Sequence, residues 1–285
     1  GRRTSVPELQ RPAGPLHYEI TDLTPPWVDP PATIVFHHGV GITSAIWSAW
    51  LPVLAGRYRL VRFDTRGFGR SSAPAPGFPW SLDLLAEDVL AVARAAGAEQ
   101  FHLVGESLGG TVGLWLATRH APGLLSLTMC STSHRGASIQ RVREWRDFIG
   151  RNGMAAWSAM MMPHRLDPGH VSPAAYRWFE AEQAKSSPHV TLDLADLLIG
   201  TDLTRDLPTV TTPTLVLAPE ASPFVPLAIA REIHALVPGS EIQEFPGLRH
   251  AIAYSHGPAC ARALRAFLSR RGLGDRRGVL PIREG

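Results

Sequence analysis

The fold of this chain is decided by the stretch Phe101-His102-Leu103-Val104-Gly105-Glu106-Ser107-Leu108-Gly109. It begins with an apolar run typical of a buried strand, and the residues that follow it, 110–117, have the pattern of a helix. A G-x-S-x-G sequence between a strand and a helix predicts a sharp turn that raises the hydroxyl of Ser107 above a sheet. Because side chains would collide in so tight a turn, the geometry requires glycine at Gly105 and Gly109. The context therefore predicts a nucleophile elbow centred on Ser107.

Composition indicates one enzyme-sized unit. The chain has 285 residues, of which 45% are hydrophobic, and two cysteines, Cys130 and Cys260, that we expect to be buried free thiols. The net charge is only +3, from 28 basic and 25 acidic residues, and the basic residues are scattered, so nucleic-acid binding is not expected. No zinc-type spacing, signal-peptide pattern or apolar run of ~20 residues occurs in the sequence. We expect no cofactor, no metal, no membrane partner and a cytoplasmic location, and homo-oligomerisation is left open.

Short apolar runs alternate with helical patterns along most of the chain. Strands are expected at residues 16–23, 33–37, 58–64, 101–105, 125–130, 214–218 and 241–245. Helices are expected at residues 44–54, 82–96, 108–119, 227–237 and 258–269. Several strands are continuous Val/Ile/Leu/Phe runs, which favours an α/β fold with a mostly parallel central sheet. The turn-rich connector 24–31 favours a hairpin between the first two strands.

The alternation stops between residues 134 and 212. This segment is helical in pattern, rich in Trp and Met, and too long to be a loop. We therefore expect a core formed by residues 1–133 and 213–271, a helical cap at 134–212, and a poorly ordered tail at 272–285. The cap is expected to cover the site, with substrate contacts from Trp145, Trp157 and Met161.

Four motifs, in this order, resemble those of the α/β-hydrolase fold superfamily over nearly the whole chain. They are Phe36-His37-His38-Gly39-Val40-Gly41, Phe63-Asp64-Thr65-Arg66-Gly67-Phe68-Gly69-Arg70-Ser71, the turn at Ser107, and Phe245-Pro246-Gly247-Leu248-Arg249-His250. The resemblance implies an α/β-hydrolase fold, in which a mostly parallel sheet is flanked by helices and carries a helical cap insertion. The length of the cap and its residues 153–157 are similar to those of enol-lactonase-like hydrolases.

The resemblance also implies the catalytic roles. Serine is a poor nucleophile at neutral pH until a base removes its proton, and His250, after the last strand, is the expected base. His256 is the alternative. The oxyanion of the reaction needs donors that are already aimed, for which we expect the backbone N–H groups of Leu108 and Val40. Asp64, Arg66 and Gly67 are expected to brace loops.

The position of the catalytic acid departs from the family pattern. An acid normally follows the strand at 214–218 in a G-x-x-D-like sequence, but Ser222 occupies the aspartate position, and residues 130–133 offer no carboxylate. Glu220 is the nearest acid, and its longer side chain makes it the candidate for the third catalytic residue. Ser222 could instead orient the imidazole through a hydrogen bond, and both alternatives are kept open.

These features predict a hydrolase that cleaves a small carboxylic ester or lactone through an acyl-Ser107 intermediate. The alternatives are a lyase or perhydrolase on the same scaffold, or a small-molecule receptor with little turnover. A substrate carboxylate would need a positive site, and four cationic residues of the cap are candidates: His134, Arg135, His164 and Arg165. The competing interpretation is that these charges are solvated.

Overall fold

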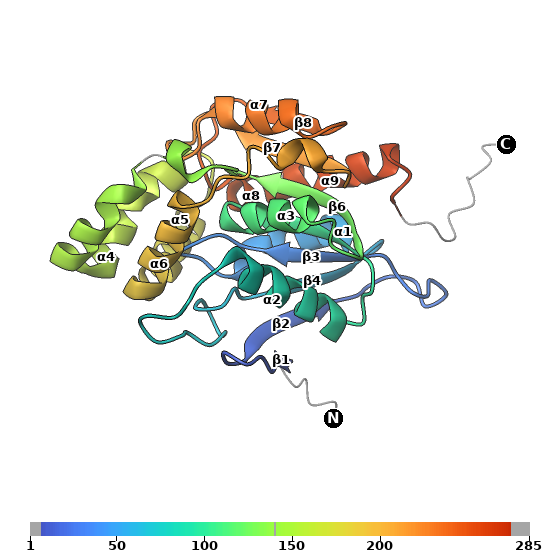
Figure 1. Cartoon of the computed structure of the whole chain (residues 1–285), viewed down its shortest axis with the longest axis horizontal. Helices are drawn as coiled ribbons and strands as arrows, with labels where there is room; N and C mark the ends of the chain where they lie inside the picture. Colours follow the sequence, from blue (N-terminus) through green and yellow to red (C-terminus); the bar gives the residue numbers. More distant parts are fainter. Residues whose placement is uncertain (1–6, 140, 275–285) are drawn as a thin grey trace.

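The strands form one sheet, which is mostly parallel as predicted. The computed structural model describes residues 7–139 and 141–274, and its strand order is β1-β2-β4-β3-β5-β6-β7-β8 (Figure 1). The strands are β1 (Glu8–Leu9), β2 (Leu16–Thr21), β3 (Thr33–His37), β4 (Arg59–Phe63), β5 (Phe101–Glu106), β6 (Leu124–Cys130), β7 (Thr214–Pro219) and β8 (Glu241–Phe245). Strands β3 to β8 pair in parallel, and β1 and β2 are antiparallel.

The predicted hairpin between the first two long strands is wrong. Strand β2 pairs antiparallel with β4, with Tyr18 opposite Phe63, and β3 lies between β4 and β5. Every residue of β3 is buried, whereas β2 is only partly buried. The continuous apolar strand therefore takes the central place in the sheet and the more polar strand lies near the edge.

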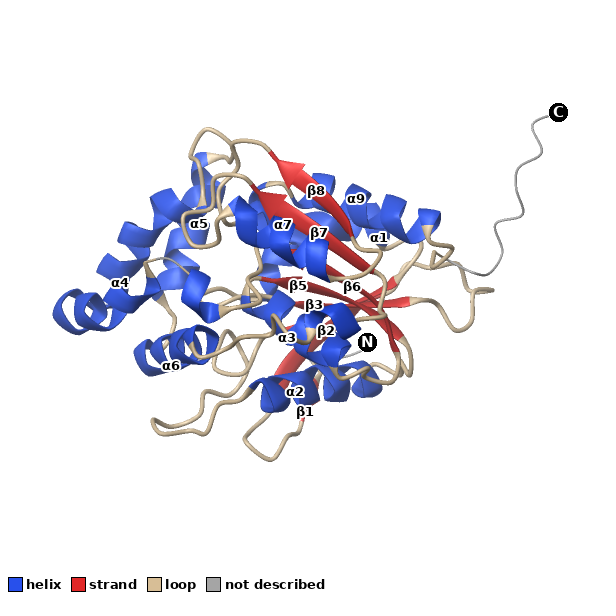
Figure 2. Cartoon of the chain, turned by 45° about the horizontal axis from the view of Figure 1, so that its top comes forward, coloured by secondary structure: helices blue, strands red, loops and turns tan. Residues whose placement is uncertain are grey.

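Helices cover both faces of the sheet (Figure 2). One face carries α2 (Leu82–Ala95), α3 (Leu108–Thr118) and α7 (Leu227–Leu236), whose buried residues join one hydrophobic cluster. The other carries η1 (Ser44–Trp50), α1 (Leu51–Leu54), α8 (Ile252–Ser255) and α9 (Gly257–Arg270), which form a second cluster. In β3, Val35 belongs to the first cluster, and Ile34 and Phe36 belong to the second, because successive side chains of a strand point to opposite faces.

Three long helices lie between β6 and β7 in the chain. They are α4 (Trp145–Arg165), α5 (Pro173–Ala184) and α6 (Pro188–Ile199), accompanied by the short 3-10 turns η2 (Gly136–Ser138), η3 (Val142–Glu144) and η4 (Leu207–Thr209). Figure 1 shows α4, α5 and α6 together at one end of the sheet. They fall within the segment predicted as the cap. Of the expected tail, residues 275–285 lie outside the described residues.

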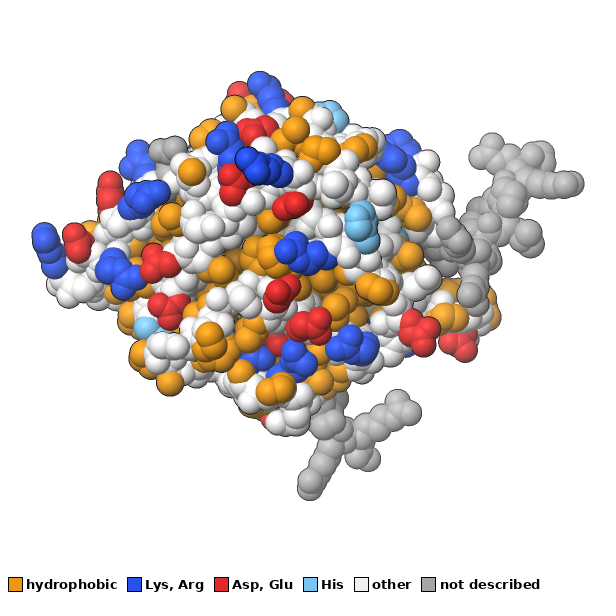
Figure 3. Space-filling model, viewed as in Figure 1, with side chains coloured by type: hydrophobic (Ala, Val, Ile, Leu, Met, Phe, Trp, Pro, Cys, Tyr) orange, Lys and Arg blue, Asp and Glu red, His pale blue; other side chains and the backbone are white. Residues whose placement is uncertain are grey.

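Opposite charges are interspersed on the surface shown in Figure 3, where Lys and Arg side chains lie beside Asp and Glu. Ion pairs of the exposed side chains include Arg146 with Asp196 and Arg231 with Glu244. Cys130 and Cys260 are both buried free thiols, as expected. Within residues 7–139 and 141–274, no helix combines the length and the apolar character needed to cross a bilayer.

A buried ion pair fastens the loop after β4 to helix α2. Arg66 is 1% exposed, and its Nε and Nη2 donate to the two carboxylate oxygens of Asp88, each at 2.9 Å. Its Nη1 donates to the carbonyl of Ala13 at 2.7 Å, and Arg11 also reaches Asp88 at 3.0 Å. Arg66 therefore connects this loop, α2 and the segment before β2, which is the bracing role expected for it.

We expect Arg66→Ala to lower the free energy of unfolding by about 3–5 kcal/mol, because it removes the bidentate partner of a buried carboxylate. The matched control is Arg70→Ala in the same loop, whose side chain is 65% exposed and which should cost less than about 1 kcal/mol. Urea denaturation of the three proteins measures both values. Equal losses in the two variants would contradict the assignment.

Candidate active site

Ser107 occupies a strained turn between β5 and α3. Its φ of 51° and ψ of −113° lie outside the regions that a non-glycine residue ordinarily adopts. Its N–H donates to the carbonyl of Cys130 at 2.8 Å, and its carbonyl accepts from the N–H of Gly110 at 2.9 Å. Such strain persists only where the surrounding structure fixes the backbone. The strand, turn and helix have the arrangement on which the sequence prediction depends.

Glycine is required on both sides of Ser107. A Cβ on Gly105 would lie 2.3 Å from the carbonyl carbon of Gly109, and a Cβ on Gly109 would lie 2.1 Å from the carbonyl oxygen of His37. Both distances are far below van der Waals contact with backbone atoms that have little freedom to move. The turn can therefore pack against β3 only with glycine at these two positions.

His250 follows β8 and is held by hydrogen bonds from several directions. It is 2% exposed, and its Nδ1 lies 2.8 Å from the hydroxyl oxygen of Ser222. Its carbonyl accepts from the hydroxyl of Ser131 at 2.5 Å, and its N–H donates to the carbonyl of His164 at 3.4 Å. The imidazole thus has a fixed position, with Ser222 as the side chain bonded to Nδ1.

Glu220, the predicted catalytic acid, makes no hydrogen bond to His250 among the described residues. Glu220 is exposed, and its Oε2 accepts from the backbone N–H of Gly247 at 2.7 Å. The backbone of Glu220 remains bonded to Phe245 at the end of β8, which directs the carboxylate to the next turn and away from His250. The alternative, in which Ser222 contacts the imidazole, agrees with the geometry.

Ser222 is not equivalent to a carboxylate. Its oxygen also accepts from the backbone N–H groups of Val225 at 3.2 Å and Phe224 at 3.4 Å. A carboxylate can only accept from Nδ1–H, whereas a hydroxyl can either accept from Nδ1–H or donate to Nδ1. The hydrogen bond from Ser222 therefore leaves the tautomer of His250 unfixed and supplies no negative charge to an imidazolium.

The electrostatic surroundings of His250 disfavour its protonated form. Burial, and then the nearby guanidinium of Arg165, hold the pKa of His250 well below its usual value. No carboxylate in the described part of the chain raises this pKa. His250 is therefore neutral, and available as a base, at neutral pH.

Ser107 and His250 line the same cavity, whose volume is about 40 Å³. The rest of the wall is mainly apolar and comes from α3, the loops after β3, β6 and β7, and the cap segment: Val40, Thr111, Ser133, Ile139, Val142, Trp145, Arg165, Ala195, Leu198, Phe224 and Val225. In liquid water each molecule takes about 30 Å³, and pockets for drug-sized ligands have at least about 300 Å³. A larger substrate must therefore displace part of this wall.

Of the three residues predicted to contact substrate, only Trp145 lines the cavity. Trp157 and Met161 are fully buried and do not line this cavity. The ring of Trp157 packs edge-on against Trp145 at a centroid distance of 5.0 Å and lies close to Gly41. Trp157 and Met161 both belong to the hydrophobic cluster on the face of α2, α3 and α7.

The loop after β3 is held in place by a residue that sequence reasoning missed. Glu106, buried between Gly105 and Ser107, accepts from the N–H of Gly39 through Oε2 at 2.7 Å. Burial raises the pKa of Glu106, an effect opposed by the charge of Arg165 and by this hydrogen bond. The only signal in the sequence is the place of Glu106 next to the nucleophile candidate.

Two N–H groups beside this loop remain free to bind an anion. Those of Val40 and Leu108 have no hydrogen-bond acceptor in the part of the chain that the structure describes. Val40 follows directly on Gly39, so the bond from Gly39 to Glu106 fixes its orientation. The two N–H groups therefore meet the chemical requirement for the predicted oxyanion hole.

Comparison with known proteins agrees with the architecture. The sequence model of the family described as alpha/beta hydrolase fold matches residues 32–159. A solved hydrolase from Pseudomonas aeruginosa PA01 superposes with a TM-score of 0.81 and 25% identity, covering 93% of this chain and 98% of that one. This chain has the α/β-hydrolase fold. An enol-lactonase from Burkholderia xenovorans LB400, with a TM-score of 0.82, 24% identity and coverage of 92% and 100%, shares this fold.

Two sequence relatives of this chain carry names that state a type of reaction. A protein from Caulobacter sp. (strain K31), named "Putative carbamate hydrolase RutD", is 28% identical over 244 residues, or 83% of this chain and 90% of the relative. A protein of the same name from Klebsiella pneumoniae subsp. pneumoniae is 28% identical over 253 residues, or 86% of this chain and 93% of the relative. Together with the fold, these similarities support a hydrolase.

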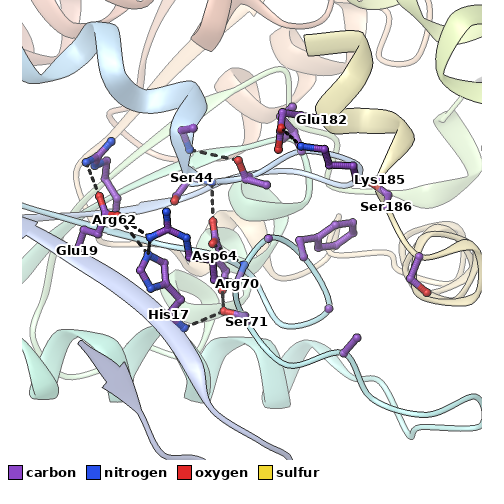
Figure 4. Close-up of a pocket in the computed structure, with 18 of the residues that line it drawn as sticks. His17, Glu19, Ser44, Arg62, Asp64, Arg70, Ser71, Glu182, Lys185 and Ser186 are labelled. Carbon is purple, nitrogen blue, oxygen red and sulfur yellow. Dashed lines mark hydrogen bonds and ion pairs between the residues drawn. The ribbon is translucent and has the colours of Figure 1, made fainter. Parts of the chain in front are cut away.

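A larger cleft of this α/β-hydrolase fold lies elsewhere. It has a volume of about 600 Å³ and is lined by β2, the loop after β4 and the cap, but by neither Ser107 nor His250 (Figure 4). Its charged side chains are already engaged: Arg62 with Glu19 at 2.8 Å, and Lys185 with Glu182 at 2.5 Å. None of the serines that line the cleft among the described residues has a positive φ like that of Ser107.

Only one of the four cationic candidates of the cap reaches the cavity. His134 and Arg135 both bind the carboxylate of Glu232 on α7, at 3.1 and 2.8 Å. His164 contributes its backbone carbonyl to the loop of His250 and does not line the cavity. Arg165 does line it.

Proposed function

We propose that this chain is a serine hydrolase that cleaves a small carboxylic ester or lactone through an acyl-Ser107 intermediate. The observation that carries the proposal is that Ser107, in its strained turn, shares one cavity with His250 and Val40. The turn then serves as a nucleophile elbow, and α4, α5 and α6 serve as the cap over the core. The mainly apolar wall suits a small apolar acyl or ring group.

In the proposed reaction His250 accepts the proton of Ser107 through Nε2 as the hydroxyl oxygen attacks the substrate carbonyl. This requires the tautomer with a proton on Nδ1, which Ser222 then accepts as a hydrogen bond. The N–H groups of Val40 and Leu108 stabilise the oxyanion. The imidazolium returns its proton to the leaving oxygen, and water, activated by His250, hydrolyses the acyl-enzyme.

The second candidate is a small-molecule receptor with little turnover. It is favoured by one observation: the side chain bonded to Nδ1 of His250 is the hydroxyl of Ser222, not a carboxylate. The two functions differ in kinetics, because an enzyme releases product over many turnovers, whereas a receptor that is acylated once stalls after a burst. Carbamates, the substrates in the name of the RutD relatives, are a further class of carbonyl compound to include in a substrate panel.

We expect a fluorophosphonate to label Ser107 alone and to add one adduct per chain in intact-mass analysis, because His250 activates this hydroxyl. Ser107→Ala should abolish labelling, and His250→Ala should slow it by about a hundred-fold or more. An adduct on another serine, or none, would refute the proposed nucleophile. Release of several equivalents of phenol from a phenyl ester distinguishes the enzyme from the receptor.

The pH dependence of kcat/KM should reflect the environment of His250. Only the neutral imidazole accepts a proton, and burial and Arg165 hold its pKa well below 6.5. Activity should therefore be constant from neutral pH down to 6.5 and be lost only as the pH falls further, through the lowered pKa. A decline centred at or above 6.5 would contradict this assignment.

Ser222→Asp should raise kcat by about ten-fold or more, since the loss of such a carboxylate in a serine protease costs about 10⁴. The carboxylate would fix the Nδ1–H tautomer and stabilise the imidazolium, and it would also accept from the N–H groups that now bind Ser222. It should also move the loss of activity to higher pH. The control Glu220→Gln should change kcat by less than about two-fold, because Glu220 binds Gly247 and not His250. A large loss in this control, with correct folding, would restore Glu220 as the acid.

A further inference from the structure

Arg165 is a buried cation in the wall of the proposed active site. It is the last residue of α4, is 5% exposed, and lines the cavity with Ser107 and His250. Among the described residues, no carboxylate oxygen lies within 4.0 Å of its guanidinium nitrogens. Burying a charge without an ionic partner is costly, and proteins rarely do so without a function.

The contacts of Arg165 within the protein are to neutral groups. Nε donates to Oε1 of Gln183 at 3.1 Å, Nη2 donates to the carbonyl of Val40 at 3.3 Å, and the guanidinium carbon lies 5.4 Å from the ring centre of Phe224. The hydrogen bonds of Arg165 with residues 7–139 and 141–274 involve Nε and Nη2 and not Nη1. The guanidinium is thus oriented by the protein while part of its donor capacity is unused.

The nearest carboxylate does not offset this charge by direct contact. Glu106 interacts with Arg165 electrostatically, but its Oε2 is bonded to the N–H of Gly39, and burial raises its pKa. In the cavity wall itself, Arg165 and His250 are the ionisable side chains in the described part of the chain. The wall therefore offers a positive charge and no negative one.

Backbone hydrogen bonds join the end of α4, which carries the guanidinium of Arg165, to the loop that carries the imidazole of His250. The N–H of Ala251 donates to the carbonyl of Arg165 at 2.9 Å, and the N–H of His250 donates to the carbonyl of His164 at 3.4 Å. The end of α4 is therefore connected directly to the loop of His250. A ligand that binds Arg165 is held beside the catalytic base.

We propose that Arg165 binds a carboxylate on the acyl or ring part of the substrate, so that the natural substrate is an anionic ester or lactone. This inference rests on the proposed function and names its substrate class. Because Arg165 and Ser107 line one cavity of about 40 Å³, a short chain separates the carboxylate from the reacting carbonyl. Monoesters of short dicarboxylic acids and lactones bearing a carboxylate fit this description.

A substrate carboxylate at Arg165 would also affect the charge of His250, because the side chain bonded to Nδ1 of His250 is a hydroxyl and not a carboxylate. Arg165 disfavours the imidazolium of His250, and the protein supplies no carboxylate at Nδ1 to offset this. A substrate anion bound to the guanidinium reduces that repulsion when the imidazolium forms. Anionic substrates are therefore expected to gain in kcat as well as in KM.

A matched pair of esters tests the proposal: phenyl hydrogen glutarate, which is anionic, and phenyl 4-carbamoylbutanoate, its neutral amide of the same size. In the unaltered protein kcat/KM should favour the anion by about ten-fold or more, as expected for a charge-assisted hydrogen bond in a closed site. Because both esters are measured on one sample, the ratio is independent of the fraction of protein that is folded.

Arg165→Met should reduce this ratio to about one, and Arg165→Lys should keep part of it, because the charge remains while the planar guanidinium is lost. The matched control is Arg146→Met on the same helix, where the arginine is exposed and paired with Asp196 at 2.6 Å. This control should keep the full ratio. A ratio near one in the unaltered protein, or a full ratio in Arg165→Met, would overturn the proposal.

Fluorophosphonate labelling separates this inference from the proposed function. If Ser107 is not labelled, the proposed function fails, and this inference fails with it. If Ser107 is labelled but neither ester is turned over, protection from labelling is compared for glutarate and glutaramide. Protection by glutarate alone, lost in Arg165→Met, supports the anion site, and equal protection by both compounds overturns it.

Discussion

The close approach of the turn at Ser107 to strand β3 is the constraint on which the site depends. Gly109 touches the carbonyl of His37, and Ser107 donates its N–H to the carbonyl of Cys130 at the end of β6. The strained residue is therefore fixed by both neighbours of β5 in the sheet. Since the strain is maintained by the central parallel strands, the order β3-β5-β6 is a requirement of the site as well as of the core.

Buried polar groups extend this constraint from the turn to the loop after β3. Glu106 holds the N–H of Gly39, and His38 accepts from the N–H of Thr65 through Nε2 at 2.9 Å. Burial keeps the pKa of His38 below its usual value, so this nitrogen can accept. Each partner would be costly to leave unsatisfied in the interior, and the network therefore helps to fix the orientation of the Val40 backbone.

Local patterns predicted the core strands well, because continuous apolar runs and glycine spacing are properties of short segments. The pairing of β2 with β4 could not be predicted in this way, since the connector shows only that the chain turns and not which strand it returns to. Similarly, the apolar character of Trp157 predicted that its side chain is buried, but not whether the side chain lines the cavity. The sequence shows that Glu220 lies two residues before Ser222, but it does not show where the carboxylate of Glu220 points. That direction is set by the hydrogen bonds of Glu220 to the end of β8 and the turn after it.

Charge was the least predictable property, because four cationic residues of the cap look alike in sequence and differ only in what surrounds them. Arg135 lies against Glu232, whereas Arg165 lies in the cavity without such a partner among the described residues. The end of α4 is tied to the loop of His250 by backbone bonds and by Arg249, which donates to the carbonyls of Pro163 and Leu166 at 2.9 and 3.1 Å. Displacing the end of α4 would displace His250 as well. Room for a substrate larger than the cavity must therefore come from the rest of the wall formed by the segment 134–212, which consists of Ile139, Val142, Trp145, Ala195 and Leu198.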